Sequence, residues 1–343
     1  MSHWNSFGLA IFAAVCLLGE ATGSAQAQIA TEWSDGGVIK LGGLPGSTDS
    51  GALAINNVGQ VVGVSGGEAV EWSGGSVIDL GPGIAESINL GGQAAGYSPG
   101  LALWSATEWS GGSVIHLQNL PGATESLAYG INDAGQVVGA SFIDGGVYAT
   151  EWSGGSVINL GGLQGQTYNL AYSINDAGQS VGYSAGRDHG YATKWGDGSV
   201  IPLGLGLANS INDAGQIVGQ DVDGAAEWSG GTVINLGGLT GSAVSEAESI
   251  NDAGVVVGYS IAGGAEYATE WSGGIDGSIL NLGGLPGFDS SEATGINDAG
   301  QVVGDSFFAP PPVPEPSTWA MVLAGFASLA FACYRRGKAT RGS

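Results

Sequence analysis

The chain has 343 residues, of which 66 are glycine, 43% are hydrophobic and only 11% are charged, and its net charge is −24. Disordered chains combine low hydrophobicity with high charge, so this composition favours a packed, turn-rich fold. The negative charge argues against binding to nucleic acid or to anionic membrane surfaces, because like charges repel.

Residues 1–28 are predicted to be a secretory signal peptide. The segment from Phe7 to Leu18 is apolar, and Ala25 and Ala27 are small residues suited to a cleavage site. Because the leader carries little positive charge before its apolar segment, an uncleaved N-terminal membrane anchor is the alternative. We expect export, with cleavage favoured over anchoring.

Residues 29–308 contain two short motifs that alternate seven times. One is a Trp followed by a Gly-rich turn, and the other is Ile-Asn-x-x-Gly. The positions are Trp33, Trp72, Trp109, Trp152, Trp195, Trp228 and Trp271, and Asn56, Asn89, Asn132, Asn175, Asn212, Asn251 and Asn297. Such alternation indicates one supersecondary unit that is copied seven times.

Each unit is predicted to be two β-hairpins. In the copy from Ala128 to Leu160, Asn-Asp-Ala-Gly forms the first turn and Ser-Gly-Gly the second. A Gly closes each second strand in this interpretation, at Gly63, Gly96, Gly139, Gly182, Gly219, Gly258 and Gly304. Four short antiparallel strands in roughly 40 residues are typical of a β-propeller blade, and seven blades lie within the usual range. We expect the Trp side chains to pack between blades.

The type of hairpin at each end of the repeat domain predicts a closed ring. The repeat domain begins with a Trp hairpin at residues 31–41 and ends with an Asn hairpin at residues 295–306. If these halves form one blade, both sheet edges are hidden from aggregation. The alternative is an open β-solenoid, which would need capping repeats at its ends.

Candidate catalytic residues are few. His116 is expected on an exposed strand, and His189 lies in a loop that only one unit has. The sequence contains no His-Glu-x-x-His or Walker motif. We therefore predict no catalytic site and no cofactor.

The Asp of the first turn raises the question of calcium binding. It recurs at Asp133, Asp176, Asp213, Asp252 and Asp298, and Asp221 and Asp223 form the nearest local cluster. Calcium requires six to eight oxygen ligands from closely spaced groups, whereas each turn offers one Asp and one Asn. A role in the turn itself is favoured, so the sequence predicts no metal site and calcium remains the alternative.

The C-terminus has three parts. Residues 309–317 form a Pro-rich linker, residues 318–334 a hydrophobic segment predicted to be a transmembrane helix, and residues 335–343 a basic tail. The positive flank predicts a cytoplasmic tail with the repeats outside the cell. Removal of both ends would also remove Cys16 and Cys333, which excludes disulfides from the mature domain.

This C-terminal pattern resembles the PEP-CTERM sorting signal of Gram-negative bacteria. The residues that carry the resemblance are Val313, Pro314, Glu315, Pro316, Ser317, Arg335 and Arg336. It implies recognition by an exosortase, a membrane transpeptidase. It further implies membrane anchoring through the C-terminus until sorting, and a final place at the cell surface or outside the cell. The producing bacterium would make exopolysaccharide, as in biofilms.

The repeats resemble the HAF family of extracellular repeats. The segment from Leu160 to Ser184, LGGLQGQTYNLAYSINDAGQSVGYS, carries the resemblance, and similar segments surround Asn132, Asn251 and Asn297. The resemblance covers nearly all of the repeat domain and implies a surface location, but no activity.

The sequence therefore predicts a non-catalytic binding or structural component of the cell surface or exopolysaccharide matrix. Its expected partners are an extracellular polysaccharide or surface proteins. The alternative is an extracellular enzyme that acts on glycans through paired carboxylates in the centre of the propeller.

Overall fold

The computed structural model describes residues 28–100, 103–187, 189–273 and 277–308, and every regular element within these ranges is a β-strand. In the same ranges no helix is long and apolar enough to span a membrane. The predicted signal peptide, the Pro-rich linker, the hydrophobic segment and the basic tail lie outside the described residues, apart from Gln28.

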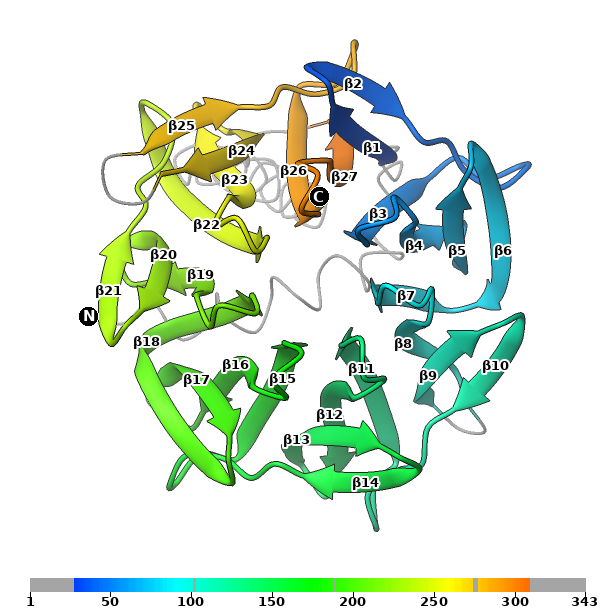
Figure 1. Cartoon of the computed structure of the whole chain (residues 1–343), viewed down its shortest axis with the longest axis vertical. Coiled ribbons are helices and arrows are strands. Elements are labelled where there is room, and N and C mark those ends of the chain that lie inside the picture. The colour runs from blue at the N-terminus through cyan, green and yellow to red at the C-terminus, as the bar shows by residue number, and fades with distance from the viewer. Residues whose placement is uncertain (1–27, 101–102, 188, 274–276, 309–343) are drawn as a thin grey trace, which may run out of the picture. The chain divides into compact units, whose positions relative to one another are not determined.

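The described strands form seven antiparallel blades around a common axis (Figure 1). Blade 1 is β26 (Ser290–Ile296), β27 (Val302–Phe307), β1 (Ile29–Ser34) and β2 (Gly37–Lys40). Blade 2 is β3 (Ser50–Ile55), β4 (Val61–Ser65), β5 (Glu68–Ser73) and β6 (Ser76–Pro82). Blade 3 is β7 (Ile84–Ile88), β8 (Ala94–Pro99), β9 (Trp104–Ser110) and β10 (Ser113–His116). Blade 4 is β11 (Glu125–Ile131), β12 (Val137–Ile143), β13 (Gly146–Ser153) and β14 (Ser156–Asn159).

Of the remaining three blades, blades 5 and 6 share one long strand. Blade 5 is β15 (Tyr168–Ile174), β16 (Ser180–Ala185), β17 (Gly190–Gly196) and the first part of β18 (Ser199–Ile211). Blade 6 is the rest of β18, β19 (Ile217–Asp221), β20 (Gly224–Ser229) and β21 (Thr232–Asn235). Blade 7 is β22 (Ser242–Ile250), β23 (Val256–Ala262), β24 (Ala265–Ser272) and β25 (Ser278–Asn281). Because β18 pairs with β17 and then with β19, blades 5 and 6 belong to one continuous sheet.

The two ends of the repeat domain complete one blade. Strand β1 pairs with β27 in antiparallel register, with Thr31 opposite Gly304 and Trp33 opposite Val302. This pairing of the first and last hairpins was predicted from the phase of the repeats and is confirmed. An open solenoid would leave these two strands unpaired.

The Asn of each first turn stabilises the turn with its side chain. In blade 4 the backbone N–H of Gly135 donates to the carbonyl of Asn132 at 3.0 Å, and the N–H of Gln136 donates to Oδ1 of Asn132 at 2.9 Å. Gly135 has a φ of 74°, a left-handed conformation that favours glycine. These local bonds explain why Asn and Gly recur at this spacing.

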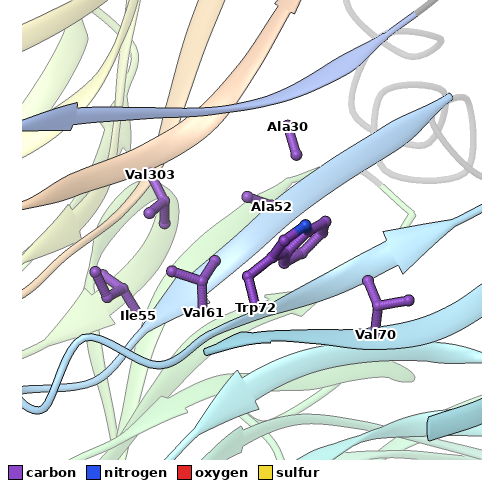
Figure 2. Packing of buried hydrophobic residues seen from close by; sticks show 7 residues of the cluster. All are labelled: Ala30, Ala52, Ile55, Val61, Val70, Trp72 and Val303. Atoms are coloured by element: carbon purple, nitrogen blue, oxygen red, sulfur yellow. The ribbon is translucent and has the colours of Figure 1, made fainter. Parts of the chain in front are cut away.

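The hydrophobic core lies between neighbouring blades. Figure 2 shows Trp72 of blade 2 beside Ala30 and Val303, which belong to blade 1. The Trp72 indole N–H donates to the carbonyl of Gly42 at 3.1 Å, in the loop that leaves blade 1. The same type of bond joins Trp33 to Gly283, Trp152 to Gln118 and Trp195 to Gly161. Each of these rings therefore fills an interface and ties a blade to the loop before it.

Every inner strand contains a β-bulge opposite a glycine. In β11 the register shifts between Ala128 and Gly130, which leaves Tyr129 as the extra residue, and Gly139 stands opposite Ala128. A Cβ on Gly139 would lie 2.0 Å from the carbonyl oxygen of Leu127, so only glycine fits there. The seven repeat glycines thus stand within their strands, where they make room for the bulge, and the interpretation that they close the second strand is wrong.

Candidate functional site

A closed ring of hydrogen bonds holds the seven inner strands around the axis. The side-chain amide of each repeat Asn donates to the backbone carbonyl of the repeat Asn in the next blade, at 3.0 or 3.1 Å. All seven side chains are buried. We call Asn56, Asn89, Asn132, Asn175, Asn212, Asn251 and Asn297 the Asn ring. It fixes the positions of the strands that surround the centre.

The Asn ring lines a cavity of about 200 Å³. The residue after each Asn also lines it, and at five blades this residue is Asp. Each of these carboxylates accepts a backbone N–H from the preceding blade, at 2.7 to 3.0 Å. Burial and the neighbouring carboxylates raise the pKa of Asp176. Among the described residues, no group of three or more His, Cys, Asp or Glu is placed to hold a metal ion.

The seven bulged residues form a second layer along the same strands. We call Leu53, Glu86, Tyr129, Tyr172, Asn209, Glu248 and Thr294 the belt. Neighbouring members contact each other: the rings of Tyr129 and Tyr172 lie edge to face at 5.6 Å, and Asn209 Nδ2 donates to Glu248 Oε2 at 3.3 Å. Bulges re-aim side chains, and these seven place one bulged residue on the first strand of each blade.

One side of the belt is aromatic. Tyr129 and Tyr172 stand on blades 4 and 5, and the rings of Tyr168 and Tyr183 lie 6.5 Å apart on blade 5. Blade 3 adds Trp104, which packs on Tyr97 with ring centroids 5.3 Å apart and stays 39% exposed. We call Tyr97, Trp104, Tyr129, Tyr168, Tyr172 and Tyr183 the aromatic arc.

The other side of the belt is acidic. Glu248 belongs to the belt, and Glu246 precedes it by two residues on β22. Asn209 Nδ2 donates to Glu246 Oε1 at 3.1 Å as well as to Glu248, and the Tyr259 hydroxyl donates to Glu246 Oε2 at 2.8 Å. We call Glu246, Glu248, Glu266, Glu292 and Asp305 the acidic arc, because the charges of the other four members add to burial in raising the pKa of Glu292.

Burial is the main cause of the raised pKa values in the acidic arc. Desolvation raises the pKa of Glu248 and Glu292 well above the ordinary range, and neighbouring carboxylates add to this. Burial also raises the pKa of Glu266 and of Asp305 to about 7. No Lys or Arg of the described part lowers any of these values. The arc is therefore a set of carboxyls without a cationic partner in this part of the chain.

The belt connects the aromatic and acidic arcs, because Asn209 on blade 6 stands between Tyr172 on blade 5 and Glu248 on blade 7. Burial is the first cause that raises the pKa of Tyr172, but the charge of Glu246, two blades away, is also among the causes. Glu86, on the belt in blade 3, has a pKa raised by burial to about 7, while a hydrogen bond with Tyr97 acts in the opposite direction. The centre of the ring thus combines phenol rings with protonatable carboxyls.

The residues singled out from the sequence lie elsewhere. The repeat Trp side chains are buried between blades, and the repeat Asn side chains form the Asn ring. His116 is exposed on β10, with Nδ1 3.3 Å from Thr107 Oγ1, and His189 lies near Tyr191 with ring centroids 6.5 Å apart. The sorting residues 313–317, 335 and 336 are outside the described residues.

The belt was missed because it is the part of the strand that does not repeat. In every inner strand an Ala stands just before the belt residue and an Ile two positions after it, for example Ala128 and Ile131 around Tyr129. The belt position itself holds Leu, Glu, Tyr, Asn or Thr. A variable position between an Ala and an Ile that occur in all seven copies was the sequence signal that could have revealed the belt.

One comparison with protein families identifies the C-terminal segment. Residues 312–336 match the model of the PEP-CTERM protein-sorting motif. The chain carries a sorting signal. A PEP-CTERM motif implies export, membrane anchoring before processing, recognition by an exosortase-type enzyme and sorting to the surface.

Two solved structures resemble the chain at low sequence identity. A protein assigned as TolB from Agrobacterium tumefaciens is 14% identical, with a TM-score of 0.49 over 84% of this chain and 100% of that one. TolB from Acinetobacter baumannii is 12% identical, with a TM-score of 0.45 over 82% of this chain and 64% of that one. No curated protein sequence matches the chain.

Proposed function

We propose that the chain is an exported, surface-sorted binding protein without catalytic activity, and that the belt with its two arcs is the ligand site. The observation that carries this proposal is the asymmetry of the belt. Trp, Asn, Ile and Gly repeat in all blades and have structural roles, whereas the belt residue differs between blades, with tyrosines on blades 4 and 5 and carboxyls on blades 3 and 7. Binding sites commonly combine aromatic surface with a few convergent polar groups.

The proposed layout places this site outside the cell. Residues 1–28 act as signal peptide, residues 29–308 form the HAF-like repeat domain, and residues 309–317 link it to the membrane segment 318–334 and the basic tail 335–343. The sorting motif supports exosortase processing, after which the ring would be released to the cell surface or matrix. An acidic domain of this kind is suited to binding an exopolysaccharide or a surface protein of the producing cell.

The aromatic arc allows a direct test of binding. Trp104→Ala and Tyr172→Ala remove ring surface, and we expect each variant to bind the producer's polysaccharide or surface proteins at least about tenfold more weakly. Val114→Ala truncates an exposed side chain on the outer strand β10 and serves as the control. Glycan arrays and pull-downs with the producer's own polymers supply the measurement. If no such polymer or protein binds, the proposal fails.

A glycan hydrolase is the second candidate, because the acidic arc contains a pair of carboxyls in different environments. Asn209 Nδ2 donates to Glu246 Oε1 at 3.1 Å and to Glu248 Oε2 at 3.3 Å, so these two carboxylate oxygens lie close to each other. Burial raises the pKa of both carboxyls, but hydrogen bonds from Asn209 and Tyr259 oppose this rise at Glu246, whereas the charge of Glu246 adds to it at Glu248. Such a separation of pKa values suits a base and an acid in glycan hydrolysis.

The two candidates differ in one measurable outcome. In an enzyme, Glu248→Gln would abolish the release of reducing ends from the bound polymer while the polymer still binds. In a binding protein, the unmodified chain releases no reducing ends from any polymer that it retains. Incubation of the chain with each retained polymer, followed by a reducing-end assay, separates them.

A further inference from the structure

We propose that the acidic arc binds the ammonium group of an unacetylated amino sugar, with the sugar ring against the aromatic arc. This assignment rests on the proposed binding function and names its ligand class. Three features of the site carry it: carboxyls without a cation, an acceptor without a donor, and aromatic rings on the same belt.

The acidic arc lacks a positive charge of its own. Its five carboxyls come from β22, β24, β26 and β27. The basic residues of the described part are Lys40 on the outer strand β2, Arg187 in the loop before β17, and Lys194, whose ammonium donates to Gln179. Gathering carboxyls at a partly buried place is unfavourable unless a cation pairs with them. A bound ammonium would supply that cation.

A buried acceptor within the arc also lacks a donor. Asn209 is 9% exposed, and its Nδ2 lies 3.1 Å from Glu246 Oε1 and 3.3 Å from Glu248 Oε2. Its Oδ1 is buried and has no hydrogen-bond partner among the described residues. An unpaired buried acceptor costs free energy, so a native site normally satisfies it. An ammonium group has three donors and no acceptor, which suits a site where an unpaired amide oxygen belongs to a side chain that also contacts two carboxylates.

The chemistry of the arc favours an organic cation over a metal ion. Calcium requires six to eight oxygens at 2.3–2.6 Å around one point. No group of three or more acidic, His or Cys side chains in the described ranges has a placement suited to a metal. An ammonium group needs only two or three acceptors at ordinary hydrogen-bond distances, which Glu246, Glu248 and Asn209 supply.

The aromatic arc favours a sugar over a lysine side chain as the carrier of the ammonium. Tyr172 is the belt residue of the blade next to that of Asn209, and its ring meets that of Tyr129. Aromatic rings offer flat apolar surface and a negative face, which suit the apolar face of a sugar ring and an adjacent cation. A flexible lysine stem would make less use of the tyrosines on blades 4 and 5.

The test compares two oligosaccharides that differ in charge. The full chain in detergent is titrated calorimetrically with the tetramer of glucosamine and with the tetramer of N-acetylglucosamine. We expect the glucosamine tetramer to bind at least about tenfold tighter, which corresponds to about 1.4 kcal/mol. Glu246→Gln and Glu248→Gln, alone and combined, should remove this preference. Glu151→Gln, which alters a carboxylate paired with Gln136 in blade 4, should keep it.

If the variants do not fold, measurements on the unmodified chain still test whether an ammonium group is recognised. The affinity for the glucosamine tetramer should fall as NaCl rises from 50 to 500 mM, while that for the acetylated tetramer should not change. Equal affinities for both tetramers, lost in Tyr172→Ala, would overturn the ammonium assignment and leave the binding function intact. Tighter binding of tetralysine, or displacement of the sugar by calcium chloride alone, would overturn it in favour of a peptide or a metal ion. Absence of binding by every probe and by the producer's polymers would reject both proposals.

Discussion

The side-chain amide of Asn297 donates a hydrogen bond to the backbone carbonyl of Asn56 at 3.0 Å, although 241 positions separate the two residues in the chain. This bond completes the Asn ring at the junction between blade 1 and blade 2. Since the repeat domain contains no cysteine, closure depends on this contact, on the pairing of β1 with β27, and on the packing around Trp72.

Asn297→Ala should therefore destabilise the closed ring. It removes the donor to the Asn56 carbonyl, which keeps only the N–H of Gly59, and it removes the buried acceptor for the N–H of Gln301. We expect a loss of about 1–3 kcal/mol in the free energy of unfolding, measured by denaturant titration. Asn281→Ala, at an exposed turn, removes only a local bond to Gly283 and should cost less. Equal losses in the two variants would mean that the Asn ring adds nothing specific.

Gly139→Ala should disrupt the bulge that presents Tyr129. The new Cβ would lie 2.0 Å from the carbonyl oxygen of Leu127, so β11 and β12 must move apart. We expect a cost of roughly 3 kcal/mol or more, because the clash is with backbone and overpacking alone costs 1–3. Gly37→Ala places a Cβ no closer than 3.5 Å to its neighbours and is the control. A Gly139→Ala variant with parental stability would contradict this account of the repeat glycines.

Substitution of two tryptophans should show that one side chain stabilises the fold and the other binds ligand. Trp72→Ala empties the interface between blades 1 and 2 and removes the bond to Gly42, which should cost about 3–5 kcal/mol. Trp104→Ala removes a ring that is 39% exposed and should change stability little while it weakens ligand binding. Thermal unfolding and a binding titration on both variants provide the comparison. If Trp104→Ala unfolds as early as Trp72→Ala, the ring of Trp104 is structural.

The stability of the domain should fall as the pH rises toward neutrality. Burial raises the pKa of Asp305 from 3.8 to about 7, so between these values the folded state holds a proton that the unfolded state has lost. The favourable contribution is complete below pH 4 and disappears as the pH passes about 7, with a slope of at most about 1.4 kcal/mol per pH unit. Glu86 and Glu266, each with a pKa raised to about 7, change stability in the same direction.

Asp305→Asn tests the contribution of this residue. Because the variant cannot ionise there, its stability relative to the parent should improve steadily from pH 4 to pH 7 and then level off. Unfolding titrations at several pH values measure the difference. A difference that is independent of pH would show that Asp305 titrates normally in the folded chain.

The fold was predictable because its determinants recur in every copy. Asn132 and its six equivalents predict the turn, and Trp72 and its equivalents predict the interface, since each copy confirms the others. The site was not predictable in the same way. Tyr129 and Glu248 occupy one structural position, but their convergence depends on bulges and ring closure that bring distant blades together. The Asp residues of the turns attracted the calcium hypothesis, whereas the structure has them accept backbone N–H groups.

The bulge and its facing glycine have a consequence for how such a protein can change over time. The facing glycine leaves room for the bulged backbone, and the repeat Ala and Ile pack in the core. The belt residue between this Ala and Ile contributes little to either the bulge or the core. Each of the seven copies therefore offers one position whose identity can drift without loss of the scaffold. A lineage with this architecture could exchange one surface partner for another by a few substitutions, in the way that an antibody varies its loops on a constant frame.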